Sequence, residues 1–497
     1  MKVAVSTEEM RRSDAAEIAS GTPSPELMYR AGKAVRESYS WENGVVIVCG
    51  TGNNGGDGYV LAAELKKRGI DCRLVLLEER FSEDGRHYFE MCVALGIPWE
   101  TFTVDTTFAD ASSIVDCIFG TGFRGCAEGK AAELIRAINS AGKPVISVDI
   151  NSGMNGDSGM GDPCIKSDLT VAIGSYKYGH FLGRAKDVIR KLICVDIGIP
   201  VFTEHTCRVV ESEDFVSLLG SREQLTHKGD YGYVGILGGC MEYSGAAKLA
   251  NMSCSALRAG CGVVTLAVPK TIAMSVAPYL LESTLKLLPD DGEGHMIFDA
   301  EALDGFLSKQ KAIAIGMGWG CSAENEKILS YILEHYERPL VIDADGLNTL
   351  AALDKNLLRN TKARVILTPH LKEFERLCRV SVVELQSDPM EYARKFAAEY
   401  GVCLLLKGAC TVVTDGGESY LVNRGCAGMA TAGSGDVLSG VLAGLLGYAP
   451  ASPLTVACGA YLAGLAGELA AFDCNPTSMI ASDTVRHLPD AVMMMTK

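Results

Sequence analysis

Short hydrophobic runs alternate with amphipathic stretches along the first half of the chain. The runs predict strands at Val45–Cys49, 73–77, 113–119, 145–150, Leu169–Ile173 and 192–197. Apolar positions with helical spacing fall between these runs, at 59–68, 85–95 and 131–141. Apolar strands that alternate with helices predict a parallel sheet covered on both faces, with ligands at the carboxyl ends of its strands.

The first 44 residues are polar and carry two helix-start signals. Ser6-Thr7-Glu8-Glu9 has the form of a helix cap. Pro25 predicts the first turn of a second helix that continues through Arg36, and the first clear strand is expected only at 45–49.

The alternation lapses after Pro200, where the segment 203–221 contains the charge cluster 211–214. We place the domain boundary here, which gives predicted domains 1–209 and 210–497. In the second domain the alternation returns, with strands predicted at 233–237, 263–268, 313–320, 340–345, 365–370 and 404–414, and helices at 245–259, 324–335 and 390–399. The predicted fold class is α/β: a doubly wound domain followed by a second, larger α/β domain.

The stretch 437–467 contains no charged residue and is as long as a membrane span. Pro450 and Pro453 divide it, and its glycines and alanines recur at helical spacing. We therefore expect two closely packed, buried helices and no membrane interaction.

Composition narrows the class of protein. The 497 residues are 48% hydrophobic and 22% charged, which is typical of a globular chain of two or three domains. The net charge of −15 repels nucleic acid, so none is expected as a partner, although loop N–H groups still bind small anions. The 18 cysteines are scattered without CxxC spacing, and the N-terminus lacks an apolar signal core, so we expect a reduced, cytoplasmic location.

A dense glycine loop follows the first apolar strand. Gly50-Thr51-Gly52-Asn53-Asn54-Gly55-Gly56-Asp57-Gly58 stands between a strand and a helix, which is the phosphate-binding arrangement of doubly wound folds. The two asparagines can contact a phosphate, a ribose or a cation, and Asp57 can cap the helix or meet a ribose hydroxyl. A tight turn without a ligand is the plainer alternative, but one or two glycines would suffice for it.

Two carboxylates, Asp116 and Asp149, end predicted strands of the first domain, so both are expected in the ligand crevice. Each can bind a cation, hold a hydroxyl group or transfer a proton. Either one alone is equally well explained as a loop cap. Three glycine-rich loops at the same sheet edge favour a site.

Three strand ends in the second domain also carry polar groups. Asp343 and Asp345 follow one strand and are expected to hold magnesium or the counterion of a phosphate. His370, with Glu373 one turn later, follows another, although a lone histidine is often structural. Lys407 follows a third, where a lysine can also be just the solvated end of a strand.

The segment 430–447 joins a small-residue turn to an almost wholly apolar helix. Gly433, Ser434 and Gly435 let the backbone approach an anion at the helix start, where N–H groups are free. Asp436 in the first turn is either an N-cap or a base that deprotonates a hydroxyl as the hydroxyl attacks a phosphoryl group.

The motifs resemble those of a known family. GTGNNGGDG (50–58), DCIFGTGFRG (116–125) and SVDINSGMNGDSG (147–159) resemble the NAD(P)H-hydrate epimerase domain, of Rossmann-like fold. HKGDYG (227–232), IDADGLN (342–348), TPHLKEF (368–374), KGACTVVTDG (407–416) and GMATAGSGDVLSG (428–440) resemble the ADP/ATP-dependent NAD(P)H-hydrate dehydratase domain, of ribokinase-like fold. Both halves stand in family order, as in the fused bifunctional repair enzymes of bacteria.

The resemblance implies two activities. The first domain would interconvert the R and S hydrates of NADH and NADPH. The second would phosphorylate the ring hydroxyl of the S hydrate with ADP or ATP, ADP being favoured, in the presence of Mg²⁺, and then eliminate phosphate. The alternative is a ribokinase-like vitamin or sugar kinase with an appended nucleotide-binding domain, which would leave a stable phosphorylated product. A homo-oligomer is also expected.

The resemblance also implies roles for individual residues. Catalytic roles fall to Asp436 and Asp149, and a K⁺ site to Asn54, Asp116 and Ser152. The epimerase substrate would be bound by Asn53, Asn54, Gly55, Gly56, Asp57, Gly120, Thr121, Gly122, Phe123, Arg124, Gly125, Cys126 and Asp149. The dehydratase substrate would be bound by Ala246, Gly318, His370 and Asp436, and the nucleotide by Lys407, Gly408, Ala409, Cys410, Thr411, Gly433, Ser434 and Gly435.

A few positions depart from the family pattern. Asn151 stands where the family usually has proline, and we expect it to loosen the backbone beside Asp149. Met317 and Trp319 replace the usual residues of a glycine turn, and Leu371 and Lys372 replace a Pro-Gly pair. None of these changes removes a proposed catalytic group.

Overall fold

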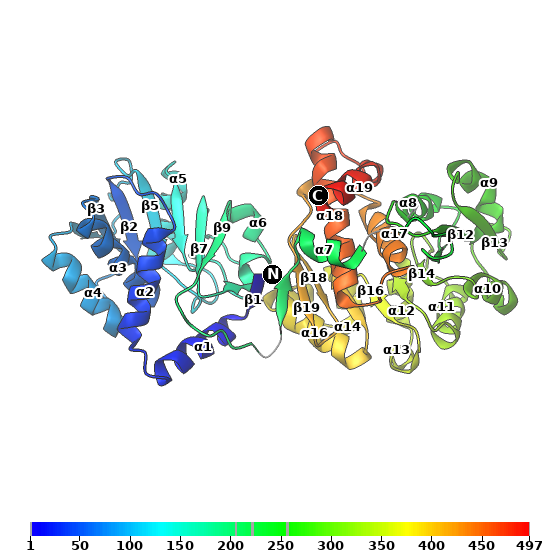
Figure 1. Cartoon of the computed structure of the whole chain (residues 1–497), viewed down its shortest axis with the longest axis horizontal. Coiled ribbons are helices and arrows are strands. Elements are labelled where there is room, and N and C mark those ends of the chain that lie inside the picture. Colours follow the sequence, from blue (N-terminus) through cyan, green and yellow to red (C-terminus); the bar gives the residue numbers. More distant parts are fainter. Residues whose placement is uncertain (1, 204–205, 220–222, 255–257, 497) are drawn as a thin grey trace. The chain divides into compact units, whose positions relative to one another are not determined.

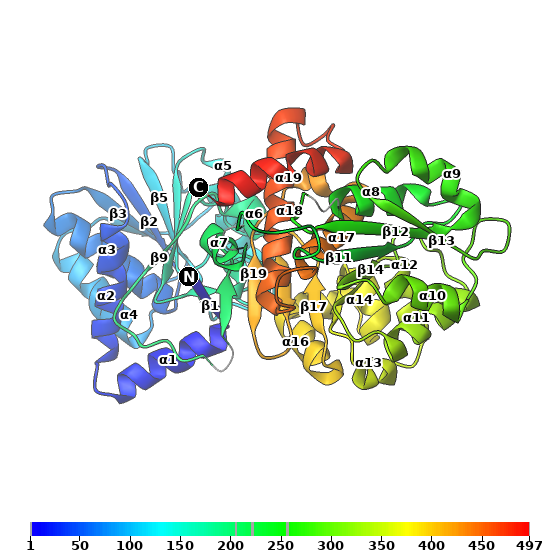
Figure 2. The same ribbon diagram turned by 45° about the vertical axis from the view of Figure 1, so that its right-hand side comes forward.

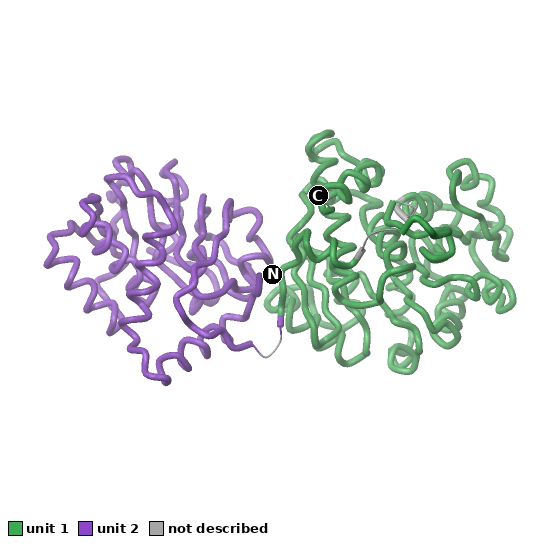
Figure 3. Tube along the Cα trace, in the orientation of Figure 1, with its two compact units in different colours: residues 1, 207–497 green, residues 2–206 purple. Residues whose placement is uncertain are grey.

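The computed structural model describes residues 2–203, 206–219, 223–254 and 258–496. The chain forms two compact units, which Figure 3 shows in purple and green. The N-terminal unit comprises residues 2–206, and the C-terminal unit begins at Cys207. The expected boundary at 209/210 falls just inside the C-terminal unit because strand β10 (Cys207–Val209) pairs with β19 (Ser419–Val422) of that unit.

The N-terminal unit is built on a parallel sheet of order β4-β3-β2-β5-β6-β7-β9. These strands are β2 (Val45–Cys49), β3 (Cys72–Leu76), β4 (Trp99–Thr101), β5 (Ser113–Cys117), β6 (Val145–Val148), β7 (Leu169–Ile173) and β9 (Leu192–Val195). The helices are α1 (Thr7–Ala19), α2 (Ser24–Glu37), α3 (Asn53–Lys67), α4 (Glu83–Ala94), α5 (Gly129–Ser140) and the short α6 (Ala185–Val188). Figure 1 shows this arrangement.

Alternate residues of β2 show why the sheet is covered on both faces. Val45, Ile47 and Cys49 pack into a core with α2, α3 and α4, whereas Val46 and Val48 pack into a second core with α5. Every residue of β2 is buried, so the strand is a continuous apolar run and not an alternating one. The predicted doubly wound arrangement is confirmed.

The first residues of the chain differ from the prediction in one respect. Ser6 caps α1 through a capping box with Glu9, as expected, and Pro25 lies in the first turn of α2. The four residues before the cap form a strand, β1 (Lys2–Val5), which pairs in parallel with the two-residue strand β8 (Tyr176–Lys177). This pairing places α1 beside the end of β7.

The C-terminal unit contains a larger mixed sheet. Parallel pairing runs through β13 (Thr284–Leu288), β12 (Val263–Pro269), β11 (Tyr233–Leu237), β14 (Ala312–Ile315), β15 (Leu340–Ile342), β16 (Val365–Leu367) and β17 (Cys403–Leu406). The predicted single strand at 404–414 is wrong: β17 turns back at 407–410 and pairs antiparallel with β18 (Thr411–Thr414), which pairs antiparallel with β19.

Helices cover both faces of this sheet. One group packs on the large apolar core: α7 (Ser212–Leu219), α8 (Ser244–Cys254), α17 (Ser434–Leu446), α18 (Pro453–Cys474) and α19 (Ala481–Met495). On the other side, seen below the sheet in Figures 1 and 2, lie α10 (Ala300–Leu307), α11 (Ala323–His335), α12 (Asp345–Ala352), α13 (Asn356–Asn360), α14 (Leu371–Cys378) and α16 (Pro389–Tyr400). The remaining short helices are α9 (Ala273–Val276) and α15 (Val382–Ser387).

The uncharged stretch forms two helices, α17 and α18, with the break between them at Gly447–Ser452, as predicted from the two prolines. Among the helices of the described residues, α18 alone is long and apolar enough to cross a membrane by length and composition. Because 83% of its most apolar window is buried within the structure, it is a core helix.

Candidate active sites

A cleft of about 840 Å³ opens in the N-terminal unit at the carboxyl ends of β2, β5 and β6. Its lining includes, of the predicted substrate-binding residues, Asn53, Asn54, Asp57, Gly120, Thr121, Gly122, Phe123, Arg124 and Asp149. Helix α1 adds Glu8, Arg11 and Asp14, which the sequence had not suggested. The predicted residues Gly55, Gly56, Gly125 and Cys126 are not part of the lining.

Close packing explains several glycines of the loop at 50–58. A Cβ on Gly50 would lie 1.8 Å from the carbonyl oxygen of Ile118, and one on Gly55 would lie 2.2 Å from the carbonyl oxygen of Gly50. A Cβ on Gly52 would meet nothing within 4 Å. The loop is therefore glycine-rich mainly because the start of α3 is pressed against its own strand and against the loop after β5.

Buried oxygen atoms gather where this loop meets the end of β5. Asp116 is fully buried and accepts hydrogen bonds from the Oγ of Ser147 at 2.8 Å and from the N–H and Oγ of Ser152 at 2.9 and 2.5 Å. The Asn54 amide donates to the carbonyl of Phe119 at 2.9 Å, and the Phe119 N–H donates to the Ser152 Oγ at 2.8 Å. Asn54 and Ser152, two of the three residues predicted as a cation site, thus contact the Phe119 carbonyl oxygen, and Ser152 links them to Asp116, the third.

Two features of this oxygen cluster suit a cation. The Oδ1 of Asn54 is buried and has no hydrogen-bond partner among the described residues. Burial raises the pKa of Asp116 despite the four hydrogen bonds that it accepts. A carboxylate and amide, hydroxyl and carbonyl oxygens are the ligands that hard cations prefer, so the residues fit a K⁺ ion.

Asp149 follows β6 with a positive φ of 65° and is paired with a buried lysine. The Lys177 Nζ lies 2.5 Å from the Asp149 Oδ1 and 2.8 Å from the carbonyl oxygen of Ile173. His180 lies 2.7 Å from the Asp149 carbonyl oxygen through Nε2, and its Nδ1 accepts from the Lys177 N–H. Burial lowers the pKa of His180 to about 4, so the ring is neutral and Nε2 donates.

Two more carboxyl groups face this pair across the cleft. Burial raises the pKa of Asp14 to about 6, with Lys177 opposing and Asp149 adding to the rise. Burial, followed by repulsion from Asp149 and Asp14, raises the pKa of Asp57 well above its usual range. The cleft therefore brings an ion pair together with two carboxyl groups whose pKa is raised.

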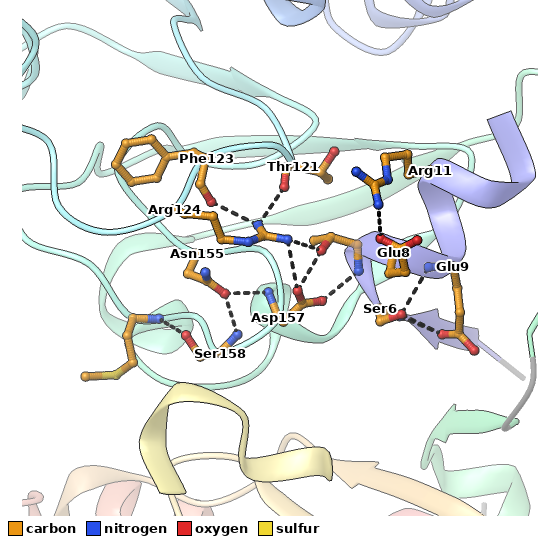
Figure 4. A network of polar contacts seen from close by, with 12 residues as sticks. Ser6, Glu8, Glu9, Arg11, Thr121, Phe123, Arg124, Asn155, Asp157 and Ser158 are labelled. Carbon is orange, nitrogen blue, oxygen red and sulfur yellow. Dashed lines mark hydrogen bonds and ion pairs between the residues drawn. The ribbon is translucent and has the colours of Figure 1, made fainter. Parts of the chain in front are cut away.

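A polar network fixes the loop after β5 to the start of α1, as Figure 4 shows. Asp157 accepts hydrogen bonds from the N–H and Oγ1 of Thr7, both at 2.6 Å. The guanidinium of Arg124 donates to the Thr7 Oγ1 at 2.8 Å and to the carbonyl of Thr121 at 2.9 Å, and lies 3.5 Å from the Asp157 carboxylate. Arg124 is thereby held at the cleft.

Asn151 does not loosen the backbone beside Asp149, contrary to the expectation. Its side chain is fully buried, and its amide nitrogen donates to the carbonyl of Ile165 at 2.9 Å and the Oγ of Ser167 at 3.0 Å. Its Oδ1 accepts from the Oγ1 of Thr170 at 2.5 Å. A satisfied buried amide ties this turn to β7, which a proline side chain could not do.

The second candidate site lies at the start of α17 in the C-terminal unit. Gly433 takes φ = 93° before the first helical turn, as the sequence predicted for this small-residue stretch. A Cβ on Gly435 would lie 3.4 Å from the Asp343 Oδ2 and 3.5 Å from the Lys407 Nζ, so the turn packs directly against both side chains. The Oγ of Ser434 is buried without a partner among the described residues.

Lys407 is the centre of a charged cluster beside that turn. Its Nζ donates to the Asp343 Oδ1 at 2.8 Å and lies 3.8 Å from the Glu373 Oε2. Burial acts to lower the pKa of Lys407, but attraction by Asp343 and Glu373 outweighs it and the pKa is raised. Burial acts to raise the pKa of Asp343, but the charge of Lys407 outweighs it and the pKa is lowered. Both groups are charged.

Asp343, predicted to hold magnesium or the counterion of a phosphate, is the counterion of Lys407 in this structure. Its second carboxylate oxygen accepts a 2.6 Å hydrogen bond from the Oγ of Ser439, which is fully buried. Asp345 accepts from the N–H of Gly320 at 2.8 Å and caps the turn after β14.

Asp436 is partly buried and has no ion-pair partner of its own among the residues described. Burial and repulsion from Asp343 raise the pKa of Asp436 to about 7, with Lys407 opposing. A carboxyl group with a pKa near neutrality at the positive end of a helix is suited to accept a proton from a bound hydroxyl.

His370, half-exposed, caps α14. Its Nδ1 accepts from the N–H groups of Lys372 at 3.1 Å and Glu373 at 3.3 Å, and its backbone N–H donates to the Glu373 carboxylate at 2.8 Å. Burial lowers the pKa of His370, with Lys407 contributing in the same direction. The backbone of Lys407 donates to Pro369 at 2.8 Å, so β16 and β17 present His370 and Lys407 at one edge.

The remaining predicted residues form two further groups. A Cβ on Gly318 would lie 2.8 Å from the Cβ of Ala246, so these two substrate-site candidates are in contact. Met317 and Trp319, on either side of Gly318, are buried. Gly408, Ala409 and Cys410 form the tight turn from β17 to Thr411, with Gly408 and Ala409 exposed.

Sequence reasoning missed Lys177, Asp14 and Ser439 as members of these sites. Lys177 follows the apolar strand Leu169–Ile173 by four residues, which is the same signal that identified Lys407 after its strand. Asp14 lies on an amphipathic helix and Ser439 within an apolar one, and neither position carries a local signal.

The fold defines a class: a two-unit α/β protein with one Rossmann-like and one ribokinase-like unit. A family model described as NAD(P)H-hydrate dehydratase matches residues 234–490, and one described as YjeF-related protein N-terminus matches residues 24–179. The order of the two matches is the order of the two units.

Curated relatives match along nearly the whole chain. The bifunctional NAD(P)H-hydrate repair enzyme of Moorella thermoacetica is 37% identical over 490 residues, which cover 94% of this chain and 92% of that protein. The enzyme of the same name from Escherichia coli K12 is 32% identical, covering 92% of this chain and 87% of that protein. The chain belongs to the family of bifunctional NAD(P)H-hydrate repair enzymes.

Solved structures agree for the C-terminal unit. The ADP/ATP-dependent NAD(P)H-hydrate dehydratase of Bacillus subtilis, co-crystallised with ATP and Mg²⁺, has a TM-score of 0.50 and 27% identity, covering 59% of this chain and all of that one. A ribokinase-like protein of Enterococcus faecalis, at 21% identity and a TM-score of 0.51 with 60% and 98% coverage, shows the same fold.

Proposed function

We propose that this chain repairs hydrated NADH and NADPH: the N-terminal unit interconverts the R and S hydrates, and the C-terminal unit dehydrates the S hydrate at the expense of ADP or ATP. Family membership over 94% of the chain supports both activities. The dehydratase proposal rests on Asp436. This residue lies in the first turn of α17 near Lys407, and its pKa is raised to about 7.

In the dehydratase reaction, Asp436 takes the proton of the ring hydroxyl while that oxygen attacks the terminal phosphoryl group of the nucleotide. The nucleotide leaves with the electron pair of the broken P–O bond. The bond from the ring carbon to the ester oxygen then breaks, phosphate leaves with its electron pair, and the neighbouring ring carbon gives a proton to water, which restores the double bond. The helix start at Gly433–Gly435 and the Lys407 charge stabilise the transferred group.

The proposal includes the binding roles that the family resemblance implies. Ala246, Gly318, His370 and Asp436 bind the hydrate in the dehydratase, and the nucleotide lies along Lys407–Thr411 and the turn with Gly433, Ser434 and Gly435. The unpartnered Oγ of Ser434 supports an anion at this turn. Mg²⁺ accompanies the nucleotide, as in the crystal of the Bacillus relative. Asp149 acts on the hydrate in the epimerase cleft.

The cation site belongs to this proposal as well. K⁺ at Asn54, Asp116 and Ser152 would balance the buried carboxylate and occupy the unpartnered Asn54 Oδ1. We expect K⁺ to raise the unfolding temperature of the chain relative to choline at equal ionic strength, by a few degrees, because a cation that binds only the folded state stabilises it. The rise should vanish in Asp116→Asn; a K⁺ effect of the same size in that variant would contradict the site.

The decisive experiment supplies the whole chain with an R and S mixture of NADH hydrate and either ADP or ATP. Full return of the near-ultraviolet absorbance of NADH, with release of inorganic phosphate, is expected. A kinase of ribokinase type would instead accumulate a phosphorylated hydrate without restoring absorbance. The same assay decides between ADP and ATP.

The proposal also covers the cellular location, the partners and the oligomeric state of the chain. The net charge of −15 and 17 described cysteines without a disulfide support a reduced cytoplasm and small-molecule partners, with neither nucleic acid nor membrane. We propose a homo-oligomer in solution, which light scattering tests directly.

A further inference from the structure

Lys177 is the most buried cation described in the N-terminal cleft. Only 1% of its side chain is exposed, yet it is among the residues that line the cleft. Two of its three ammonium N–H groups have partners, the Asp149 Oδ1 at 2.5 Å and the Ile173 carbonyl at 2.8 Å. Among the described residues no partner is recorded for the third, so it remains available to a ligand.

The residues around Lys177 hold both Lys177 and Asp149 in fixed positions. Burying an ion pair is seldom the most stable way to fill a core, because both ions lose their hydration. Here the chain also holds Asp149 at φ = 65°, fixes its carbonyl with His180, and ties the backbone of Lys177 to the same imidazole. Backbone strain that the surroundings enforce is typical of functional positions.

We propose that Lys177 is the proton-transfer partner of Asp149 in epimerisation of the hydrate, an inference that rests on the proposed function of this unit. The hydrate carries its hydroxyl on the ring carbon next to the ring nitrogen. Inverting that carbon requires one of its bonds to open and to close again on the opposite face, with one proton removed and one supplied.

The step balances without a redox partner. The Asp149 carboxylate takes the hydroxyl proton, the oxygen forms a carbonyl, and the bond from carbon to ring nitrogen breaks with its electron pair going to nitrogen. The Lys177 ammonium gives that nitrogen a proton. The opened aldehyde rotates, the nitrogen attacks the other face, Lys177 recovers its proton, and Asp149 returns its proton to the oxygen.

The other titratable groups around Lys177 are consistent with this role. Asp14 faces it from α1, Asp57 from α3 and His180 from the turn after β8. Burial raises the pKa of Asp14 to about 6, raises that of Asp57 above its usual range and lowers that of His180 to about 4. Lys177 and Asp149 are in direct contact as an ion pair.

The test uses Lys177→Ala in the full chain, with repair of the R hydrate in the presence of ADP as the readout. We expect conversion of R to fall by about 10²- to 10⁴-fold, which is typical for loss of a proton donor. Repair of the S hydrate by the other unit should be unchanged, and hydrogen exchange of the β6 amides, protected as in the unaltered chain, should show that the N-terminal unit is folded. The matched control Lys130→Ala removes an exposed lysine on α5 and should leave both rates unchanged.

Alkylamines of similar size but different basicity then separate catalysis from packing. Added to Lys177→Ala, they should restore R conversion to a degree that depends on the pKa of the amine. Rescue that is independent of amine basicity, or an R rate within about threefold of the unaltered chain, would overturn the role of Lys177 alone. No R conversion by the unaltered chain would instead overturn the epimerase assignment.

Discussion

Each unit pairs a lysine with an aspartate at the end of a parallel strand, but the two pairs are built differently. In the C-terminal unit the aspartate is the deeper partner, since Asp343 is 1% exposed and Lys407 22%. In the N-terminal unit the lysine is deeper, since Lys177 is 1% exposed and Asp149 15%. In the C-terminal unit the buried Asp343 therefore holds the more exposed Lys407 at the site. In the N-terminal unit the buried Lys177 holds the more exposed Asp149 carboxylate at the cleft.

The carboxyl groups nearby show the same contrast. Next to Lys407, Asp436 remains separate and has a pKa of about 7, which suits a base for one hydroxyl. Next to Lys177, the base candidate Asp149 is itself in the ion pair, and burial raises the pKa of both Asp14 and Asp57. One site is thus suited to moving a proton once, and the other to removing and returning it.

The largest expected effect is a loss of one activity, dehydration of the S hydrate, without a loss of the other. Asp436→Asn should reduce dehydration of the S hydrate by at least about 10²- to 10⁴-fold, because the base is lost. Nucleotide binding should persist, and conversion of R to S by the same protein should be unchanged. The measurement is chromatographic separation of the two hydrates over time; simultaneous loss of both activities would show that the variant acts through folding.

The second prediction compares the two ion pairs by stability. Lys407→Met leaves Asp343 charged and uncompensated in the core, which costs about 3–5 kcal/mol. Lys177→Met should cost less because Asp149 is partly solvated. Hydrogen exchange of the amides in β15 and β6 reports each unit separately. An equal or larger loss in β6 would contradict the difference in depth.

The third prediction concerns pH. Turnover of the S hydrate should fall about tenfold per unit as pH drops below about 7, because Asp436 must be ionised. The pKa of Asp436 is higher in the folded chain than in the unfolded one, so the folded state binds more protons between about pH 4 and 7 and its stability falls as pH rises. Asp436→Asn should therefore gain stability relative to the original chain over that window, by at most about 4 kcal/mol.

The measurement for this prediction is urea unfolding of both proteins at pH 5 and pH 8, together with the S-hydrate rate profile. A stability difference that does not change with pH would contradict the raised pKa of Asp436.

The smallest expected effect concerns the network at the epimerase cleft. Arg124→Ala removes a half-exposed side chain that ties the loop after β5 to Thr7 and Asp157. We expect a rise of a few-fold in KM for the R hydrate and little change in kcat, since partly exposed pairs contribute about 1 kcal/mol or less. Arg190→Ala removes an exposed ion pair with Asp168 and is the matched control.

Strand-end chemistry was the most predictable part of these sites. Parallel strands align their carboxyl ends, so Asp116, Asp149, Asp343 and Lys407 could be assigned to two edges from apolar runs alone. The hairpin of β17 and β18 was missed because Leu404–Leu406 and Val412–Val413 are both apolar and the five residues between them carry a single glycine. The strand β1 was missed because its four residues are stabilised by pairing with a distant segment, which no local pattern reports.

Ligand roles were harder to predict than positions. Asp343 was predicted to hold magnesium or the counterion of a phosphate because a carboxylate after a strand suits either purpose, whereas its 2.6 Å contact with Ser439, nearly a hundred residues away, could not be read from the sequence. Asn151 looked like a weak point because proline was absent, whereas its amide is buried among carbonyls and hydroxyls of β7 and its neighbours. Both outcomes depend on long-range contacts.

The crowding around Gly50 and Gly55 has a practical meaning for anyone who screens variants of this chain. Side chains at either position would displace backbone atoms of Ile118 or of Gly50 itself, so such variants should be poorly expressed or insoluble. Gly52, where an added Cβ meets nothing, is the position of the loop that can accept a reporter, a label or a redesigned contact. For inactive clones from a random library, the yield of soluble protein should therefore be measured first. Only clones with a normal yield indicate that the substituted residue contacts the ligand.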